Sequence, residues 1–291
     1  PGESFTLIQG GNVGGTGLVL SPRGRKGATL LYDFDWIYQS GANGSLTATV
    51  RNVAASPQAE SLSEGFLAGL AFTAQGQDLI SIQGVNIAAS GPEGLSTFVL
   101  GEFGSSRYNT NSHVNVDGFS LMAGLAWNAA PASGKLTLAA FFEGGWGNYD
   151  SHNSFSNAAG VTGRGDTEYY GGGILGRYQW NCGGYVEASA RMGQVSTDYR
   201  SSDLTDMAGT HTKYDMDSLY YGAHAGIGYI WKITDAASLD LSTKYLWTRQ
   251  EGDDVTLSTG DPVKFDDADS HRWRTGGRFS YEIPVADSKA S

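Results

Sequence analysis

Histidine, serine and carboxylate side chains are the residues of this chain that could do chemistry, and their spacing matches no common catalytic site. The five histidines are scattered, and none of them stands at the spacing of a zinc site. Serine, histidine and aspartate are plentiful enough for a Ser-His-Asp triad or an Asp/His protease site, but no nucleophile-elbow motif accompanies them. The histidines are His113, His152, His211, His224 and His271. We therefore expect no enzyme, no metal site and no cofactor.

Cysteine content and net charge exclude further kinds of site and partner. The single cysteine, Cys182, excludes an internal disulfide and a cysteine-cluster metal site. The 30 acidic and 19 basic residues give a net charge of −11, and such an acidic chain is poorly suited to phosphate backbones. We expect no nucleic-acid partner.

No segment has the pattern of a transmembrane helix or a signal peptide. The longest charge-free stretch, residues 4–22, is interrupted by five glycines, whereas a spanning helix needs about 20 mainly apolar residues. Hydropathy scans are nearly blind to membrane β-barrels, because their strands alternate lipid-facing and lumen-facing residues. Since the chain begins without Met in an apparent strand, we expect it to be a fragment.

The elements that would position any site fall into three regions. Residues 1–53 hold short alternating runs separated by glycine-rich turns, which predict a β-solenoid end or a small β module. Ser56 followed by Pro57 predicts a helix start, and apolar residues recur at helical spacing to about residue 80. Such a helix would be about 36 Å long. Its small residues suit close packing against a wall, and Asn52, Gly84 and Asn86 are expected in turns outside it.

Residues 97–283 read as eight strand segments, and in nearly all of them the polar residues collect on one parity. Two architectures produce this pattern: a sandwich with an apolar interior, or a membrane barrel with an apolar exterior and a wet lumen. The predicted strands, about 11 to 14 residues, exceed the usual 5 to 6 of globular sheets. The predicted connections alternate between long (109–116, 151–166, 201–217, 251–269) and short (129–134, 181–183, 232–238). This alternation is typical of outer-membrane barrels, with the short turns on the periplasmic side.

Aromatic residues gather at the two ends of the predicted strands, as the membrane interfaces require. The short-turn end holds Trp127, Trp180 and Trp231 with Tyr178 and Tyr229, and the long-loop end holds Trp146 and Trp247 with Tyr108, Tyr149 and Tyr199. A sandwich core would spread such residues along the strands. We therefore predict an antiparallel transmembrane β-barrel and an aromatic girdle at each end.

Inside this barrel we expect a helix and a wall of mixed charge. The helix would pack through Gly65, Gly69, Leu70 and Gly76. The lumen-facing charges are Glu102, Lys135, Glu143, Arg177, Glu187, Arg191, Asp240, Lys244, Arg272, Arg274, Arg278 and Glu282. Two interpretations stay open for each of them: a hydrated channel for an extended chain, or structural pairing where water is scarce.

The sequence resembles the autotransporter translocator of type V secretion. The resemblance covers about residues 56–283 and is carried by SPQAESLSEGFLAGLAF at 56–72, DTEYYGGG at 166–173 and YLWTRQEGD at 245–253. It implies an N-terminal passenger, a helix through the lumen and a twelve-stranded barrel. Residues 1–53 resemble the end of a β-helical passenger, residues 54–96 the linker helix and its connection, and residues 97–291 the translocator. Only eight strands and no terminal aromatic residue are present, so the resemblance implies four further strands. A complete eight-stranded barrel is the alternative, but its own side chains would fill the interior.

The resemblance also implies function and partners. We expect an outer-membrane translocator that carries its own passenger to the surface of a bacterium, with the barrel-assembly machinery, lipid and lipopolysaccharide as partners. The alternative is another outer-membrane barrel, a pore or an omptin-like surface protease. Some autotransporters release the passenger when a helix asparagine attacks its own backbone carbonyl. Since no asparagine occurs in residues 57–81, we expect no such cleavage.

Most of the negative charge falls in two predicted extracellular loops. Residues 201–217 contain four acids and one base, and residues 251–269 contain seven acids and one base. Together they account for −9 of the net −11. A divalent-cation or lipopolysaccharide bridge at these loops is one hypothesis, and simple solvation is the other.

Overall fold

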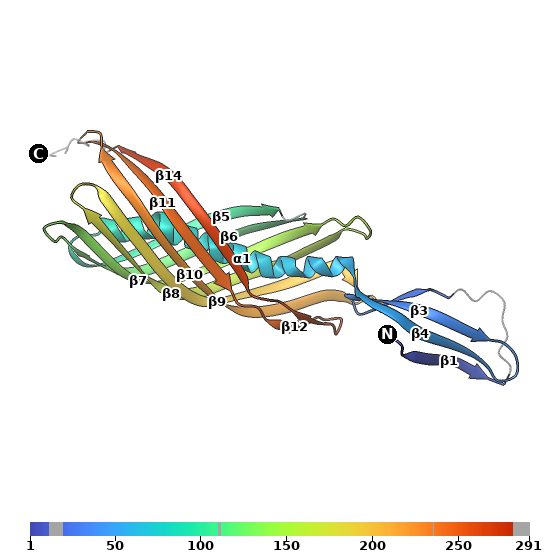
Figure 1. The fold of residues 1–291 in the computed structure, drawn as a ribbon. Helices are drawn as coiled ribbons and strands as arrows, with labels where there is room; N and C mark the ends of the chain where they lie inside the picture. The colour runs from blue at the N-terminus through green and yellow to red at the C-terminus, as the bar shows by residue number, and fades with distance from the viewer. Residues whose placement is uncertain (12–19, 110–111, 235, 282–291) are drawn as a thin grey trace, which may run out of the picture.

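The computed structural model describes residues 1–11, 20–109, 112–234 and 236–281, and most of them lie in strands. A small sheet at the N-terminus leads into one interrupted helix, and the helix lies along the inside of a large curled sheet (Figure 1). No helix in the described part of the chain has the length and hydropathy needed to span a bilayer.

The N-terminal region is an antiparallel sheet in the order β1-β4-β3-β2. Its strands are β1 (Ser4–Gly10), β2 (Arg23–Lys26), β3 (Leu30–Gln39) and β4 (Gly44–Ala55). Gly41 (φ 105°) and Asn43 (φ 64°) adopt positive φ angles in the turn between β3 and β4, which lets the chain reverse tightly. A β-solenoid stacks parallel strands, so these residues form the small β module instead. Asn52 lies within β4 and not in a turn.

The helix is longer than the sequence pattern indicated. It consists of a 3₁₀ turn η1 (Pro57–Leu62), α1 (Ser63–Leu79), a π-helical segment η2 (Ile80–Gly84) and α2 (Val85–Ser90). Pro57 occupies the first turn as expected, while the Ser56 side chain makes no capping bond. The prediction that the helix ends near residue 80 was wrong: the helix continues to Ser90, and no proline interrupts it before Pro92. Gly84 and Asn86 therefore lie inside the helix and not in turns.

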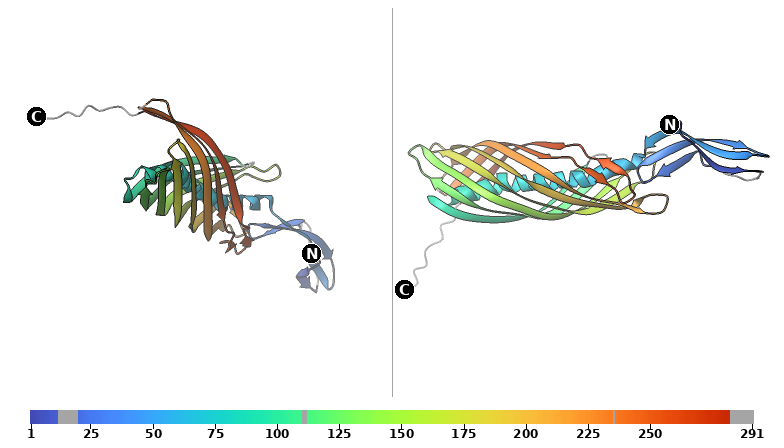
Figure 2. Two further views of the ribbon diagram at one scale, coloured as in Figure 1. Left: turned by 60° about the vertical axis from the view of Figure 1, so that its left-hand side comes forward. Right: turned by 90° about the horizontal axis from the view of Figure 1, so that it is seen from below.

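The large sheet has eight antiparallel strands in the order β14-β11-β10-β9-β8-β7-β6-β5. They are β5 (Gly94–Asn109), β6 (Ser112–Ala129), β7 (Gly134–Asn153), β8 (Val161–Trp180), β9 (Gly184–Thr205), β10 (His211–Lys232), β11 (Ala237–Gln250) and β14 (Ala268–Tyr281). Consecutive strands pair, and within the described residues the sheet is open between β5 and β14. It forms a half-barrel around the helix, as both views of Figure 2 show.

The strands are longer than predicted, from 14 to 22 residues. Three of the four predicted long loops are mainly strand. β5 and β6 are separated only by residues 110–111, which lie outside the described part, and β9 and β10 are separated by residues 206–210. Alternating polar residues continue the hairpins beyond the lipid-facing belt, because strands there are solvated on their outer face. Only residues 251–267 remain long, and they contain the hairpin of β12 (Asp254–Thr256) and β13 (Pro262–Lys264).

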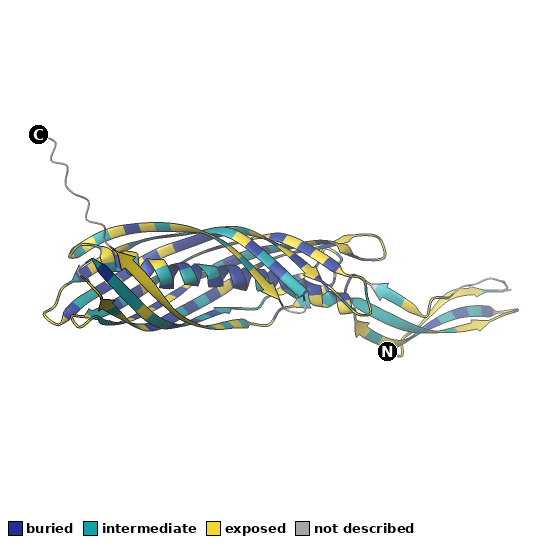
Figure 3. Ribbon diagram, turned by 90° about the horizontal axis from the view of Figure 1, so that it is seen from above, coloured by how far each residue is buried: buried dark blue, intermediate teal, exposed yellow. Residues whose placement is uncertain are grey.

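The two faces of the curled sheet decide between the alternative architectures. Apolar side chains on the outer face are exposed, including Leu95 (71%), Phe103 (85%) and Trp273 (74%). The inner face and the helix bury each other, so exposed and buried residues alternate along each strand (Figure 3). A sandwich would cover the apolar face, whereas a membrane barrel turns it to lipid. The predicted class of transmembrane β-barrel is therefore confirmed.

Candidate functional site

The candidate site is the interface between the helix and the inner wall of the sheet. Three of the predicted helix positions, Gly65, Gly69 and Gly76, face side chains of the wall at distances that exclude a β-carbon. A Cβ on Gly65 would lie 2.5 Å from Tyr214 Oη, and one on Gly69 would lie 2.8 Å from Thr197 Oγ1. At Gly76 it would collide with Tyr169. These glycines let the helix approach the wall closely.

Leu70, the fourth predicted helix position, points in another direction. It is buried and lines a small cavity of about 180 Å³ where the helix meets β5 and β14. Tyr108 borders this cavity from β5, and Asp269 borders it from β14. Leu70 therefore lies towards the two sheet edges, whereas the glycines face the continuous part of the wall.

Buried tyrosines line the outer half of the lumen. Tyr149 and Tyr199 were expected in the long-loop girdle, but they are 2% and 0% exposed and face the helix. The tyrosines of this cluster are Tyr149, Tyr169, Tyr199, Tyr214 and Tyr220. The Tyr214 hydroxyl donates to the Leu62 carbonyl at 2.6 Å. Their odd or even position in the strand could have identified these tyrosines as lumen-facing, since each one lies on the same face as small or polar neighbours.

The first turn of α1 is held by polar side chains of the wall. The buried carboxylate of Glu64 accepts hydrogen bonds from Ser112 Oγ at 2.6 Å and Asn153 Nδ2 at 2.8 Å. A carboxylate in the first turn is also stabilised by the helix dipole. Glu64 was not predicted as a site residue, because an acidic residue at a helix start is common in any exposed helix.

A buried ion pair lies at the middle of the helix. Arg191 Nη1 donates to Glu143 Oε2 at 2.8 Å, and both side chains are 2% exposed or less. Arg191 Nη2 also donates to the Thr73 carbonyl, and the Tyr220 hydroxyl donates to Glu143 Oε1 at 2.9 Å. Two of the predicted lumen charges thus join three wall strands to one point of the helix.

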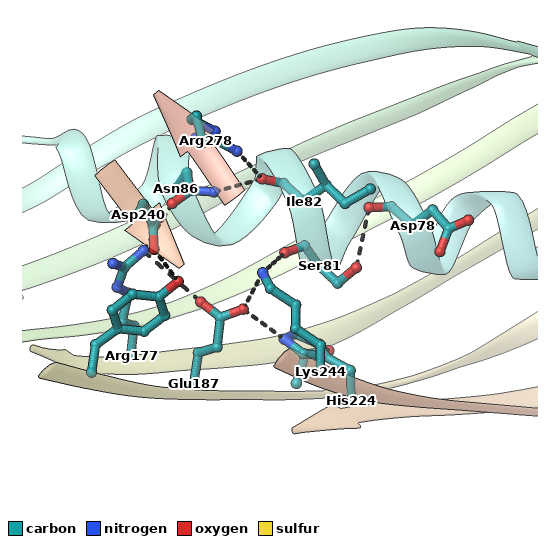
Figure 4. A network of polar contacts seen from close by, with 12 residues as sticks. Asp78, Ser81, Ile82, Asn86, Arg177, Glu187, His224, Asp240, Lys244 and Arg278 are labelled. Carbon is teal, nitrogen blue, oxygen red and sulfur yellow. Dashed lines mark hydrogen bonds and ion pairs between the residues drawn. The ribbon is translucent and has the colours of Figure 1, made fainter. Parts of the chain in front are cut away.

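A second polar cluster surrounds Glu187 near the inner end of the lumen (Figure 4). Lys244 forms an ion pair with Glu187, while Arg177 and His224 lie 3.9 and 3.6 Å from its oxygens. Arg177 also donates to Asn86 Oδ1 at 2.8 Å. Glu187 and Arg191, four residues apart on one strand, therefore belong to different clusters and do not pair in the described structure.

Basic side chains of the wall donate to backbone carbonyls of the helix, and two of these carbonyls, Ser81 and Ile82, lie in the π-helical segment. The donors and their acceptors are Arg191 to Thr73, Arg272 to Ala74, Lys244 to Ser81, Arg278 to Ile82, and Lys135 to Ala89 and Gly91. Cations near a helix C-terminus also complement its dipole. The wall therefore binds the backbone of the helix along its length.

The remaining predicted lumen charges differ in their surroundings. Arg274 lies 3.1 Å from the Asp78 carboxylate, which also pairs with Arg272. Asp240 accepts a hydrogen bond from the Tyr185 hydroxyl at 2.8 Å. Glu102 lies on β5 and is exposed. Glu282 is outside the described residues.

Trp127, Trp180 and Trp231 lie within two residues of the ends of β6, β8 and β10, and Trp247 lies three residues before the end of β11. Trp146 lies inside β7, seven residues before its end. The exposed fractions are 45% for Trp127, 41% for Trp180, 59% for Trp231 and 55% for Trp146. Trp247 is half-buried, and its indole N–H donates to Asp269 Oδ1 at 2.8 Å. The girdle role of these residues stays a prediction.

The β12–β13 hairpin folds over the outer end of the lumen. Phe265 stacks on Phe66 of the helix with ring centroids 5.6 Å apart, and the Ala28 backbone N–H donates to Asp261 at 2.7 Å. A hydrogen bond from the Gly252 N–H lowers the pKa of the Asp267 carboxyl. No group of three or more potential metal ligands occurs in the part of the chain that the structure describes.

An open-sided half-barrel with an apolar exterior, a polar inner wall and a helix along its lumen defines the class of outer-membrane translocator. The family model of the autotransporter beta-domain matches residues 97–291, and the chain belongs to this family. It contains the outer-membrane translocator domain of an autotransporter, which exposes its passenger at the cell surface. This family match decides against the pore and the omptin-like protease. A search of curated proteins returned no match.

Proposed function

We propose that the chain divides into the end of a passenger (1–53), a linker helix with its connection (54–96) and a translocator barrel (97–291). In this proposal the helix stays in the lumen after secretion, closes it and tethers the passenger to the surface. The domain is a transport element and catalyses no reaction of its own. The barrel-assembly machinery would insert it, and lipid and lipopolysaccharide would surround it.

The single observation that carries the proposal is the binding of the helix backbone by the wall. Five basic side chains from four strands, β7, β9, β11 and β14, donate to backbone carbonyls between Thr73 and Gly91. A chain that only passed through would present different residues in turn, whereas these contacts belong to one fixed register. The helix also joins the N-terminal sheet at one end of the barrel to the start of β5 at the other (Figure 1).

Asn86 is the helix residue on which self-release would depend. The expectation of no asparagine in the helix covered residues only to 81, and the helix continues over Asn86. Its Nδ2 donates to the Ile82 carbonyl at 2.5 Å, and its Oδ1 accepts from Arg177. Since both amide atoms are engaged away from the Asn86 carbonyl, we expect the bond after Asn86 to stay intact.

The experiment measures the mass of the full-length protein recovered from outer membranes, and the share of passenger in the medium. We expect the chain to be uncut after Asn86. We also expect the Asn86→Ala variant to match the wild type in mass and in the share of passenger in the medium. A fragment that begins at residue 87, lost in the Asn86→Ala variant, would contradict the proposal.

A further inference from the structure

A groove of about 870 Å³ lies on the outward face of the large sheet, near its outer end. It has no part in binding the helix. Five strands, β6 to β10, contribute its lining, mainly through outward-pointing side chains. Its basic and imidazole side chains are His113, His152, Arg164, Arg200, His211 and Lys213. A cavity of this size can hold one or two sugar rings.

Three cations stand side by side in this groove. Arg164 is opposite Arg200 in the register of β8 and β9, and Arg200 is opposite Lys213 in that of β9 and β10. Like charges directly opposite each other destabilise a sheet. A bound anion would remove this repulsion, so the row is better suited to a bound complex than to an empty surface.

Acidic neighbours compensate only the middle cation. Arg200 pairs with Asp166 at 2.9 Å and with Asp198 at 2.6 Å. Among the described residues, neither Arg164 nor Lys213 has a side-chain hydrogen bond or an ion pair. Asp150 is opposite Arg164 but forms no ion pair with it. The guanidinium group of Arg164 and the ammonium group of Lys213 therefore remain available to an external anion.

Two imidazole side chains extend the groove beyond the cations. His113 is opposite His152, and their rings lie 5.5 Å apart on the outward face. Thr162 lies beside them on β8, where its own hydroxyl is engaged by Asp203. Imidazole N–H groups can donate to sugar hydroxyls or to anionic oxygens in either protonation state. The groove thus combines anion binding with sugar-type hydrogen bonding.

The distance of the groove from the aromatic girdle indicates which part of the membrane lipid supplies the anion. Asp150, in the cationic row, stands four residues beyond the outward Trp146 on β7. At about 3.4 Å per residue and a strand tilt of about 40°, the row lies roughly 10 Å outside the girdle. Between Trp146 and the cationic row, the same outward face holds three carboxylates, those of Asp166, Asp198 and Asp215. These carboxylates disfavour a phosphate close to the acyl chains, so the anion must belong to a part of the lipid that reaches further out.

We propose that this groove binds the phosphorylated and carboxylated inner-core sugars of a lipopolysaccharide molecule in the outer leaflet. Arg164 and Lys213 would contact the anionic groups, and His113 and His152 would contact adjacent sugar oxygens. Lys213 lies in the acidic segment 201–217, but the proposed contacts are basic side chains and imidazoles, not the carboxylates of that segment. It depends on the outer-membrane location of the domain but not on retention of the helix.

The test uses the full-length protein, purified in detergent, with three probes: lipopolysaccharide carrying a phosphorylated core, lipid A without a core, and inorganic phosphate. The variant is Arg164→Gln with Lys213→Gln, which leaves the ion-paired Arg200 unchanged. Lys232→Gln is the matched control, because Lys232 is also exposed on β10 but at its opposite end. Resistance of the folded barrel to unheated detergent shows that each variant has assembled.

We expect the double variant to bind core-bearing lipopolysaccharide at least about tenfold more weakly, since each exposed charge contact contributes modestly. Binding of lipid A should not change, and Lys232→Gln should match the wild type. Unchanged affinity in the double variant would overturn the proposal. Equal binding of lipid A and core-bearing lipopolysaccharide by the wild type would overturn it as well, and so would full competition by inorganic phosphate at the concentration of the lipid. Passenger display, measured in the same cells, reports on translocation separately.

Discussion

Replacement of Gly69 by Trp is expected to abolish assembly of the barrel or surface display of the N-terminal segment. A Cβ at this position would already lie 2.8 Å from Thr197 Oγ1 and 3.2 Å from Gln250 Oε1. Gln250 is fully buried. Overpacking by a few methylenes costs about 1–3 kcal/mol, and an indole exceeds that volume several times. We expect surface display to fall at least tenfold.

The measurement is antibody binding to a tag in the N-terminal sheet on intact cells, with the amount of folded barrel measured alongside. Leu125→Trp is the matched control, because Leu125 is half exposed on the outer face and an indole there meets lipid. Gly69→Ala should lie between the wild type and Gly69→Trp. Normal assembly and display of Gly69→Trp would show that the helix does not lie against this part of the wall.

Replacement of Glu143 by Gln is expected to destabilise the folded barrel by about 3–5 kcal/mol, the usual cost of breaking a buried ion pair. Arg191 is then left without its anion, at a position where its side chain is fully buried. Tyr220 also exchanges a charged acceptor for a neutral one. The measurement is the midpoint of unfolding in denaturant for the purified full-length protein.

Two further variants separate the ion pair from general damage. Glu168→Gln removes an exposed carboxylate from the outer face of β8 and should leave the midpoint unchanged. The double variant Glu143→Leu with Arg191→Met removes both charges and should recover part of the loss, because no unpaired charge remains. If Glu143→Gln unfolds at the same midpoint as the wild type, Glu143 and Arg191 do not share a buried site.

The arrangement of strands was largely predictable because alternation is a local property. Inner and outer faces follow from period 2 alone, so the parity of Glu143, Glu187 and Trp146 was assigned from the sequence. The glycine pattern of residues 65–76 likewise indicated close helix packing. These features need no knowledge of partners distant in the chain.

The boundaries and pairings were not predictable in the same way. The helix continues past residue 80 because wall cations such as Lys244 and Arg278 bind its carbonyls, and such support comes only from the tertiary structure. Polar segments counted as loops extend strands, because pairing with a neighbouring strand decides their conformation. The position of Tyr149 and Tyr199 along their strands is consistent either with a girdle residue or with a residue that lines the lumen. Only the face of the strand on which they lie, the inner one, distinguishes the two.

The most direct test of the account is the side of the outer membrane on which each end of the barrel lies. Cys182 is exposed in the short turn between β8 and β9, and Ser156 is exposed between β7 and β8 at the opposite end. The full-length chain, with any cysteine outside residues 1–291 replaced, is treated with a maleimide that does not cross the outer membrane. We predict that Cys182 reacts only after permeabilisation, and that the Ser156→Cys variant in a Cys182→Ser background reacts in intact cells. Labelling of Cys182 in intact cells, with no labelling of the Ser156→Cys variant, would contradict the account.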